Sequence, residues 1–400
     1  MKRSGREFDR LNEKYKLVEK GTVDLTHTLK MKIKAGATKI KRFEERNLQY
    51  HQNNTFRNDM KRFFKEIDGQ LNDNPVSPNP TEATQFWSDI WSQPGSHNAD
   101  AEWLSNIQGS LQDIRQQQEQ TITKKDVKEG VRRMSNWKSA GPEFVQGFWF
   151  KQITNLHESI AKHLQECLNE GNVPDWMVKG RTVLIQKDKA KGAAVGNFRP
   201  IACLPLMWKL LTGIFAEGLY QHLTENSLFP AEQKGCRKGS RGTKDQLLID
   251  KAVLKNCKRR STNLAVAWID YRKAYDMVPH SWIVQCLSMF KVASNVKDLI
   301  TKSMGNWRTE VTSNGETLGS VNINRGIFQG DSLSPLLFVL IMIPLSMILR
   351  EAKSRYKLGK DKPSINHLLF MDDLKLYASK RDELDSLIAT VHMYSNDIGM

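Results

Sequence analysis

The stretch Asn366-His367-Leu368-Leu369-Phe370-Met371-Asp372-Asp373-Leu374-Lys375-Leu376-Tyr377 carries the strongest structural signal in the chain. Apolar residues lie on both sides of two adjacent carboxylates, which predicts two strands with Asp372 and Asp373 at the tip of their hairpin. Like charges side by side repel each other, so a bound cation or surrounding water must reduce the cost. Water around a solvated loop can reduce this repulsion, as a bound metal ion can. The Asp-Asp pair alone therefore does not distinguish a solvated loop from a metal site.

A further carboxylate stands where another apolar run ends. The run Leu264-Ala265-Val266-Ala267-Trp268-Ile269 has the length of a buried strand and stops at Asp270. If that strand faces the hairpin, Asp270 adds oxygen ligands from a separate element, as Mg²⁺ requires when substrate phosphates complete its coordination. The alternative is an aspartate that only caps the next turn.

Residues 326–335, Gly-Ile-Phe-Gln-Gly-Asp-Ser-Leu-Ser-Pro, form the third informative segment. Glycines on both sides of Gln329 would let the backbone approach a ligand closely, and Ser334-Pro335 is typical of a helix start. A plain loop-to-helix junction is the alternative. The apolar run 333–349 that follows is 17 residues long and contains two prolines. It predicts a buried core helix rather than a membrane span.

The remaining pattern indicates an α+β domain with an antiparallel sheet, because strands alternate with helices and hairpins. Asn314-Gly315 between two strand-like runs predicts a tight hairpin. Other expected elements are a strand at 182–185 and helices at 153–168, 206–223 and 384–398.

Charge points to a polyanionic partner. The 400 residues carry a formal net charge of +16, which favours nucleic acid through counterion release, although a merely basic soluble protein also fits. The five cysteines are scattered without a Cys-x-x-Cys pair, which argues against a disulfide framework or a zinc knuckle in this chain. The first residues lack the apolar run of a secretory signal.

Composition changes along the chain. Residues 1–70 hold 18 Lys and Arg against 10 Asp and Glu, and this basic arm either contacts nucleic acid or is a solvated helical surface. Residues 71–120 contain seven acidic residues and one basic residue, with several prolines. That composition predicts a connecting region, partly disordered up to about residue 85.

Taken in order and spacing, these motifs resemble the reverse transcriptases of the non-LTR (LINE-like) retrotransposon branch. The resemblance covers roughly residues 130–400 and rests on the segments Trp137-Lys138-Ser139-Ala140-Gly141-Pro142-Glu143, Val183-Leu184-Ile185-Gln186-Lys187, Asn197-Phe198-Arg199-Pro200-Ile201, Asp270 with Tyr275, Gln329-Gly330 with Leu333-Ser334-Pro335, and Phe370-Met371-Asp372-Asp373.

The resemblance implies a right-hand polymerase fold, fingers and palm, with a mostly helical N-terminal extension. The domains expected from it are a basic N-terminal extension (1–85), an acidic, helical connecting region (86–135) and a reverse transcriptase domain (136–400) that is incomplete at its C-terminus. The implied activity is RNA-directed DNA polymerisation with two Mg²⁺ ions, or Mn²⁺ in their place. The implied partners are an RNA template, a DNA primer and deoxynucleoside triphosphates, with no membrane. The implied location is the nucleus at the integration site, and the cytoplasm as a ribonucleoprotein.

The resemblance also implies a role for each matching residue. Asp270 and Asp372 would bind both ions, and Asp373 would help to position them. The ring of Tyr275 would exclude a 2′-hydroxyl, unless it is only a core aromatic. The nucleotide would be contacted by Gln329, and its phosphates by Lys187 and Arg199, although Lys187 also fits a solvated surface lysine.

The sequence departs from the family pattern in two ways. Met371 stands where this branch more often has Ala, which keeps the position apolar. The chain ends at Met400, where a lysine-bearing motif and a helical thumb follow in the family, and it lacks the usual endonuclease and zinc knuckle. A fragment, an incomplete gene model or a decayed copy of an element is therefore expected. A non-catalytic nucleic-acid-binding remnant is the rival to an active polymerase.

Overall fold

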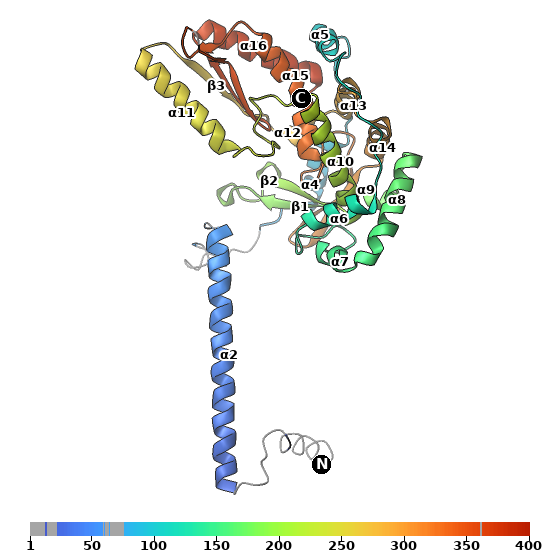
Figure 1. Ribbon diagram of the computed structural model, residues 1–400, viewed down its shortest axis with the longest axis vertical. Helices are drawn as coiled ribbons and strands as arrows, with labels where there is room; N and C mark the ends of the chain where they lie inside the picture. Colours follow the sequence, from blue (N-terminus) through green and yellow to red (C-terminus); the bar gives the residue numbers. More distant parts are fainter. Residues whose placement is uncertain (1–12, 14–21, 59, 61–63, 65–75, 361) are drawn as a thin grey trace. The chain divides into compact units, whose positions relative to one another are not determined.

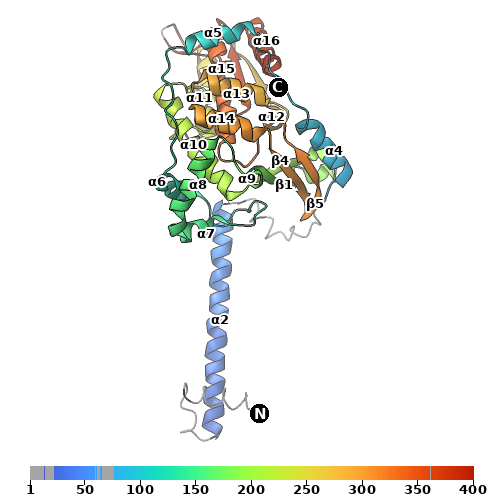
Figure 2. The same cartoon turned by 90° about the vertical axis from the view of Figure 1, so that its right-hand side faces the viewer.

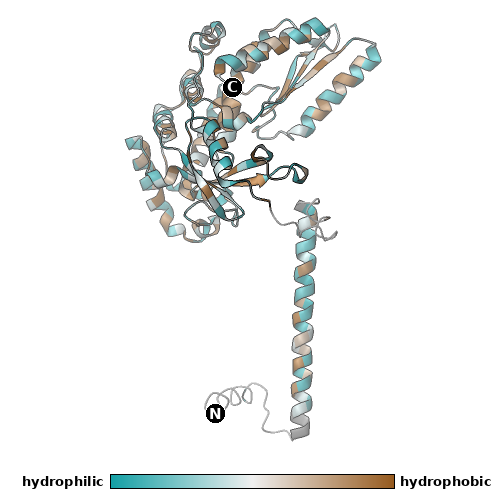
Figure 3. Cartoon of the chain, turned by 180° about the vertical axis from the view of Figure 1, so that it is seen from behind, coloured by the Kyte–Doolittle hydropathy of each residue, from teal (hydrophilic) through white to brown (hydrophobic). Residues whose placement is uncertain are grey.

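The computed structural model describes residues 13, 22–58, 60, 64, 76–360 and 362–400. The chain forms two compact units, Met1–Pro75 and Val76–Met400. In the first unit, α2 (Thr22–Asn58) is a 37-residue helix. Its surface is mostly hydrophilic (Figure 3), and from residue 26 onward nearly all of its side chains are exposed.

The second unit combines helices with three small sheets. Its α-helices are α4 (Pro80–Trp91), α5 (Glu102–Ser110), α6 (Lys124–Arg133), α7 (Gly147–Gln152), α8 (His157–Glu170), α9 (Asp175–Val178), α10 (Leu206–Glu225), α11 (Thr243–Arg260), α12 (Ala274–Met277), α13 (His280–Met289), α14 (Ser294–Met304), α15 (Ser334–Glu351) and α16 (Arg381–Ile398). Its strands are β1 (Lys179–Gln186), β2 (Phe198–Cys203), β3 (Ala265–Ile269), β4 (Arg308–Ser313), β5 (Glu316–Asn322), β6 (Tyr356–Lys357), β7 (Ser364–Ile365), β8 (His367–Phe370) and β9 (Asp373–Ala378).

Mixed helix and sheet confirm the α+β class. The strand orders are β2-β1-β4-β5, β3-β9-β8 and β6-β7. All pairs of the described strands are antiparallel except β1 with β4, so the antiparallel sheet expected from the sequence is present in β3-β9-β8, whereas the β2-β1-β4-β5 sheet is mixed. The long connection between β1 and β4 permits the parallel pairing, which a short hairpin could not.

The β3-β9-β8 sheet lies between α11 on one face and α16 on the other (Figure 1). Leu374 and Leu376 of β9 join the main core on one face, and Tyr377 packs with Val253 of α11 on the other. Successive side chains of a strand point to opposite faces of the sheet, so β9 is buried on both faces. At β3 the expected full burial is wrong, because its residues are only half-buried and Trp268 is 71% exposed.

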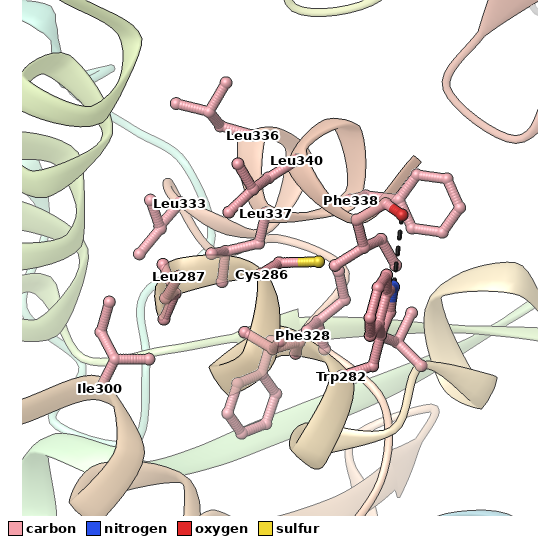
Figure 4. Packing of buried hydrophobic residues seen from close by; sticks show 14 of the residues in the cluster. Trp282, Cys286, Leu287, Ile300, Phe328, Leu333, Leu336, Leu337, Phe338 and Leu340 are labelled. Atoms are coloured by element: carbon pink, nitrogen blue, oxygen red, sulfur yellow. Dashed lines mark hydrogen bonds between the residues drawn. The ribbon is translucent and has the colours of Figure 1, made fainter. Parts of the chain in front are cut away.

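The apolar run after residue 333 forms α15, and the prediction of a buried core helix is confirmed. By length and composition α15 could cross a membrane, but 72% of its residues are buried inside the fold. Figure 4 shows its Leu337 beside Cys286 and Leu287 of α13. The Trp282 indole N–H of α13 donates to the Ile341 carbonyl of α15 at 3.3 Å.

Local sequence signals explain several element boundaries. Asn314 and Gly315 both have positive φ, 51° and 87°, and join β4 to β5 as the predicted tight hairpin. The expectation of disorder up to about residue 85 is wrong from Pro80 onward, where α4 begins. The Asn79 side chain caps α4 by accepting from the Thr81 and Glu82 amides, and Pro80 occupies the first turn.

A buried polar side chain begins the β8–β9 hairpin. The His367 ring is fully buried, with its two nitrogens 2.6 Å from Ser346 Oγ and 2.8 Å from Asn366 Oδ1. Burial lowers the pKa of His367 to about 4, with Glu232 acting to raise it and Arg350 to lower it. The imidazole is therefore neutral in the folded protein at neutral pH.

Replacing His367 by Gln should make stability less sensitive to acid. The folded pKa of about 4 lies below the ordinary 6.5, so the unfolded chain binds a proton that the folded chain does not, and stability falls as pH drops from 6.5 toward 4. Between about pH 7 and about pH 5, this effect of His367 should lower the free energy of unfolding by roughly 2 kcal/mol. Denaturant unfolding at both pH values measures it, with the exposed His392→Gln as control. Equal pH dependence in wild type and His367→Gln would exclude His367 as the responsible group.

Candidate active site

Pairing of β3 with β9 brings the predicted carboxylates to one place. Ile269, the last residue of β3, pairs with Leu374, so Asp270 leaves the strand beside the hairpin tip. The tip itself is tight: Phe370 pairs with Asp373, leaving Met371 and Asp372 as the turn, with Met371 at φ +58°.

A cavity of about 660 Å³ opens at this point, within the size range of small-molecule sites. Six of the seven residues singled out from the sequence line it, drawn from the end of β1, from β2, the loop after β3, α12, the glycine loop before α15 and the hairpin tip. They are Lys187, Arg199, Asp270, Tyr275, Gln329 and Asp372.

The carboxylates in the cavity repel one another. Burial, and then the charges of Asp373 and Asp270, raise the pKa of Asp372. Oxygen donors with excess negative charge suit a hard divalent cation. Within the described part of the chain, however, no three His, Cys, Asp or Glu side chains are close enough to form a metal cage by themselves.

Asp373 occupies a different position from its two partners. It is exposed, begins β9, and is absent from the described residues that line the cavity. Its charge nevertheless acts on Asp372. The structure therefore joins Asp270 and Asp372 at the cavity and leaves Asp373 at its edge.

Tyr275 is fixed by an aromatic contact and by its own backbone. Its ring stacks on Phe338 of α15, with centroids 4.9 Å apart and an interplanar angle of 4°. The Ile327 amide donates to the Tyr275 carbonyl at 2.8 Å, which ties the glycine loop to the segment after Asp270. Burial raises the pKa of the Tyr275 hydroxyl, so the group stays protonated at neutral pH.

The glycine loop rests directly on β2. The Ala202 amide donates to the Gln329 carbonyl at 2.7 Å. Gly330 has φ +131°, and a Cβ there would stand 2.4 Å from the Ala202 carbonyl oxygen. Only glycine allows this approach, which supports the close-approach interpretation of the sequence.

Positively charged side chains also line the cavity. Lys187 follows β1, Arg199 lies on β2, and both are exposed. Lys273, which the sequence argument did not assign, also lines the cavity. Burial lowers the pKa of Lys273 to about 8, with Asp276 opposing that shift and Lys187 adding to it.

Helix α4 supports this site, although the sequence argument assigned no chemistry to its region. α4 packs against β5 (Figure 2). Lys273 Nζ lies 3.9 Å from the centroid of the Trp87 ring, and the Trp91 indole donates to the buried Asp276 carboxylate at 3.1 Å. Burial raises the pKa of Asp276 to about 6, with Lys273 and Trp91 lowering it. The sequence did contain a signal for this helix, because Trp87 and Trp91 are four residues apart and such a spacing places both side chains on one face of a helix.

Comparison with known proteins gives a consistent result. A family model described as "Reverse transcriptase (RNA-dependent DNA polymerase)" matches residues 185–400. The Pol polyprotein of the type-1 retrotransposable element R2 from Popillia japonica is 30% identical over 67% of the chain and 36% of its own length. The Pol polyprotein of element R2DM from Drosophila melanogaster is 25% identical over 82% of the chain and 29% of its own length. The chain thus spans about a third of the length of these relatives.

Replacing Trp91 by Phe should loosen the loop that carries Asp270 and Tyr275. The change keeps an aromatic ring but removes the donor to a buried carboxylate, at a cost of about 2 kcal/mol in the free energy of unfolding. Hydrogen exchange should rise in residues 270–277. Trp103→Phe is the matched control, because it removes an indole hydrogen bond to Asp397 instead. Unchanged exchange in residues 270–277 of the Trp91 variant would contradict the supporting role of α4.

Proposed function

The chain belongs to the reverse transcriptases, with relatives among the non-LTR retrotransposon Pol polyproteins, and we propose that it is an RNA-directed DNA polymerase that extends a primer 3′-hydroxyl. The observation that carries the proposal is the single cavity lined by Asp270, Asp372, Tyr275 and Gln329 together with cationic side chains. Carboxylates and cations that line the same cavity match a nucleoside triphosphate bound through metal ions and direct phosphate contacts.

We assign the elements to a right-hand polymerase fold. The β1–β2 hairpin, which carries Lys187 and Arg199, corresponds to fingers. The β3-β9-β8 sheet, with Asp270 and Asp372 at one end, corresponds to palm. Support comes from the way both parts contribute to one cavity.

Reverse transcriptase domains generally use divalent metal ions. The residues fit such ions, because Asp270 and Asp372 offer the carboxylate oxygens that Mg²⁺ or Mn²⁺ binds. The negative charges of these groups repel each other, and a bound cation would neutralise that repulsion. We propose that these two hold both ions and that Asp373 adds negative charge from the edge. Bound ions would neutralise charge on the attacking and leaving oxygens.

The chain's own side chains account for substrate orientation. Arg199 and Lys187 donate to phosphate oxygens from the fingers side, where both lie exposed. Lys273 is held over Trp87 and contributes a further cation. Gln329, whose backbone is anchored on β2, contacts the nucleotide. An RNA template, a DNA primer and deoxynucleotides are the proposed substrates, and nucleus and cytoplasm the proposed locations.

The rival function is binding of nucleic acid without synthesis. Primer extension by the 400-residue chain, on an RNA template with deoxynucleotides and Mg²⁺, separates the two. Extension supports the polymerase, whereas tight binding of primer–template without extension supports the non-catalytic remnant.

Replacing Asp372 by Asn should reduce primer extension by at least about 100-fold, because a neutral amide is a poor ligand for Mg²⁺. Binding of primer–template should change little. Asp382→Asn on the exposed first turn of α16 is the control and should extend primers normally. Full extension by the Asp372 variant would remove this carboxylate from the mechanism.

Replacing Tyr275 by Val should increase incorporation of ribonucleotides relative to deoxynucleotides. The smaller side chain leaves room for a 2′-hydroxyl, if the ring edge faces the bound sugar. Tyr275→Phe keeps the ring and should keep the discrimination. Competition assays with both nucleotide types measure the ratio. An unchanged ratio in the Val variant would leave Tyr275 as a core aromatic stacked on Phe338.

A further inference from the structure

A short segment outside the motifs described above runs beside the catalytic hairpin. The Leu369 amide of β8 donates to the Glu232 carbonyl at 3.1 Å, and the Lys234 amide donates to the Leu369 carbonyl at 3.0 Å. These two hydrogen bonds make an isolated parallel β-bridge between Gln233 and Leu369. The segment extends the sheet by one partner beyond β8 and continues to the level of the hairpin tip.

The side chain of Gln233 forms hydrogen bonds with that tip and with its own segment. It is 1% exposed. Its Oε1 accepts from the Met371 amide at 3.0 Å and from the Gly235 amide at 2.8 Å. Its Nε2 donates to the Met371 carbonyl at 3.4 Å. One amide group therefore contacts both polar backbone atoms of the residue before Asp372.

Met371 needs such partners because of its backbone. It has φ +58°, a left-handed conformation that is unfavourable for a residue with a side chain. A residue in such a region costs about 1–3 kcal/mol and persists only where its surroundings fix it. As a turn residue of the hairpin, Met371 is outside the β8–β9 pairing.

The segment is itself anchored on both sides of Gln233. The Glu232 carboxylate forms a two-pronged pair with Arg350 of α15, with both of its oxygens 3.1 Å from Arg350 Nε. A Cβ on Gly235 would stand 2.5 Å from Met371 Sδ, so the segment passes close to the Met371 side chain at this position. The Gln233 amide is therefore presented to the tip by a rigid support.

We infer that Gln233 is a positioning residue for Asp372: its buried amide holds Met371 in the left-handed conformation that directs the next carboxylate into the cavity. This inference rests on the proposed polymerase function for its consequence in catalysis. The contact itself is independent of that function. Loss of the amide would free the Met371 peptide, and a small displacement of a reacting group can lower a rate by about 100-fold.

The test compares Gln233→Met, Gln233→Glu and Gln233→Asn in the full chain. Met has a similar length without hydrogen-bonding groups, and Glu keeps the acceptor for the Met371 and Gly235 amides. Asn keeps the amide but is one methylene shorter, so it cannot reach the tip. Gln165→Met is the matched control, because Gln165 Oε1 also accepts a backbone amide, that of Ile122, at 2.6 Å.

Hydrogen exchange of the Met371 amide is the direct readout. Exchange should accelerate at least 10-fold in the Met and Asn variants, remain slow in the Glu variant, and be unaffected by Gln165→Met. If Gln233→Met fails to fold, as judged by circular dichroism, the Asn variant alone decides the result. Slow exchange of Met371 in a folded Asn or Met variant overturns the inference.

Mn²⁺ affinity and primer extension provide the functional readouts. The Met and Asn variants should bind Mn²⁺ about 10-fold or more weakly and lose kcat by a factor of 10 to 100, with primer–template binding unchanged. A wild-type chain that neither binds Mn²⁺ nor extends primers would refute the proposed function. Exchange at Met371 would still decide whether Gln233 holds the tip. Normal kcat and Mn²⁺ affinity in a variant with accelerated exchange would overturn its role in positioning Asp372.

Discussion

Antiparallel pairing of β3 with β9 is the constraint on which the rest of the site depends. Because Ile269 lies opposite Leu374, the residue after β3 and the turn before β9 end at the same edge of the sheet. A slip of one residue would reverse which side chains of the strand face α11 and which face the main core. The two-sided core, with Leu376 on one face and Tyr377 on the other, therefore fixes the register and with it the separation of Asp270 from Asp372.

Bringing like charges together is unfavourable, and contacts from the surrounding structure hold the charged residues in place. Burial and neighbouring carboxylates raise the pKa of Asp372, because both make its negative charge less favourable. The hairpin tip is held by Gln233, and the loop after β3 is held by Trp91 through Asp276. These supports come from elements far away in sequence, so they form only when those elements fold together.

Local patterns predicted much of this arrangement. The hairpin at Asn314-Gly315, the helix start at Ser334-Pro335 and the burial of α15 all follow from backbone preferences and hydropathy within a short window. Six of the seven residues chosen from motifs meet at one cavity. Predictions were wrong where the outcome depended on distant partners. Residues from Pro80 onward looked irregular by composition, but they form α4 because Ala83 and Trp87 bury themselves in the main core.

By itself, the sequence determined the α+β class, the family and the candidate site residues, because motif order and spacing are properties of the chain alone. Tertiary structure decided which carboxylates share the cavity, placing Asp270 and Asp372 there and Asp373 at its edge. It also decided that Trp91 and Gln233 support the site. Neither residue has a chemical signature, and each acts through a hydrogen bond to a group more than a hundred residues away. Such pairs form only when folding brings separate elements into contact.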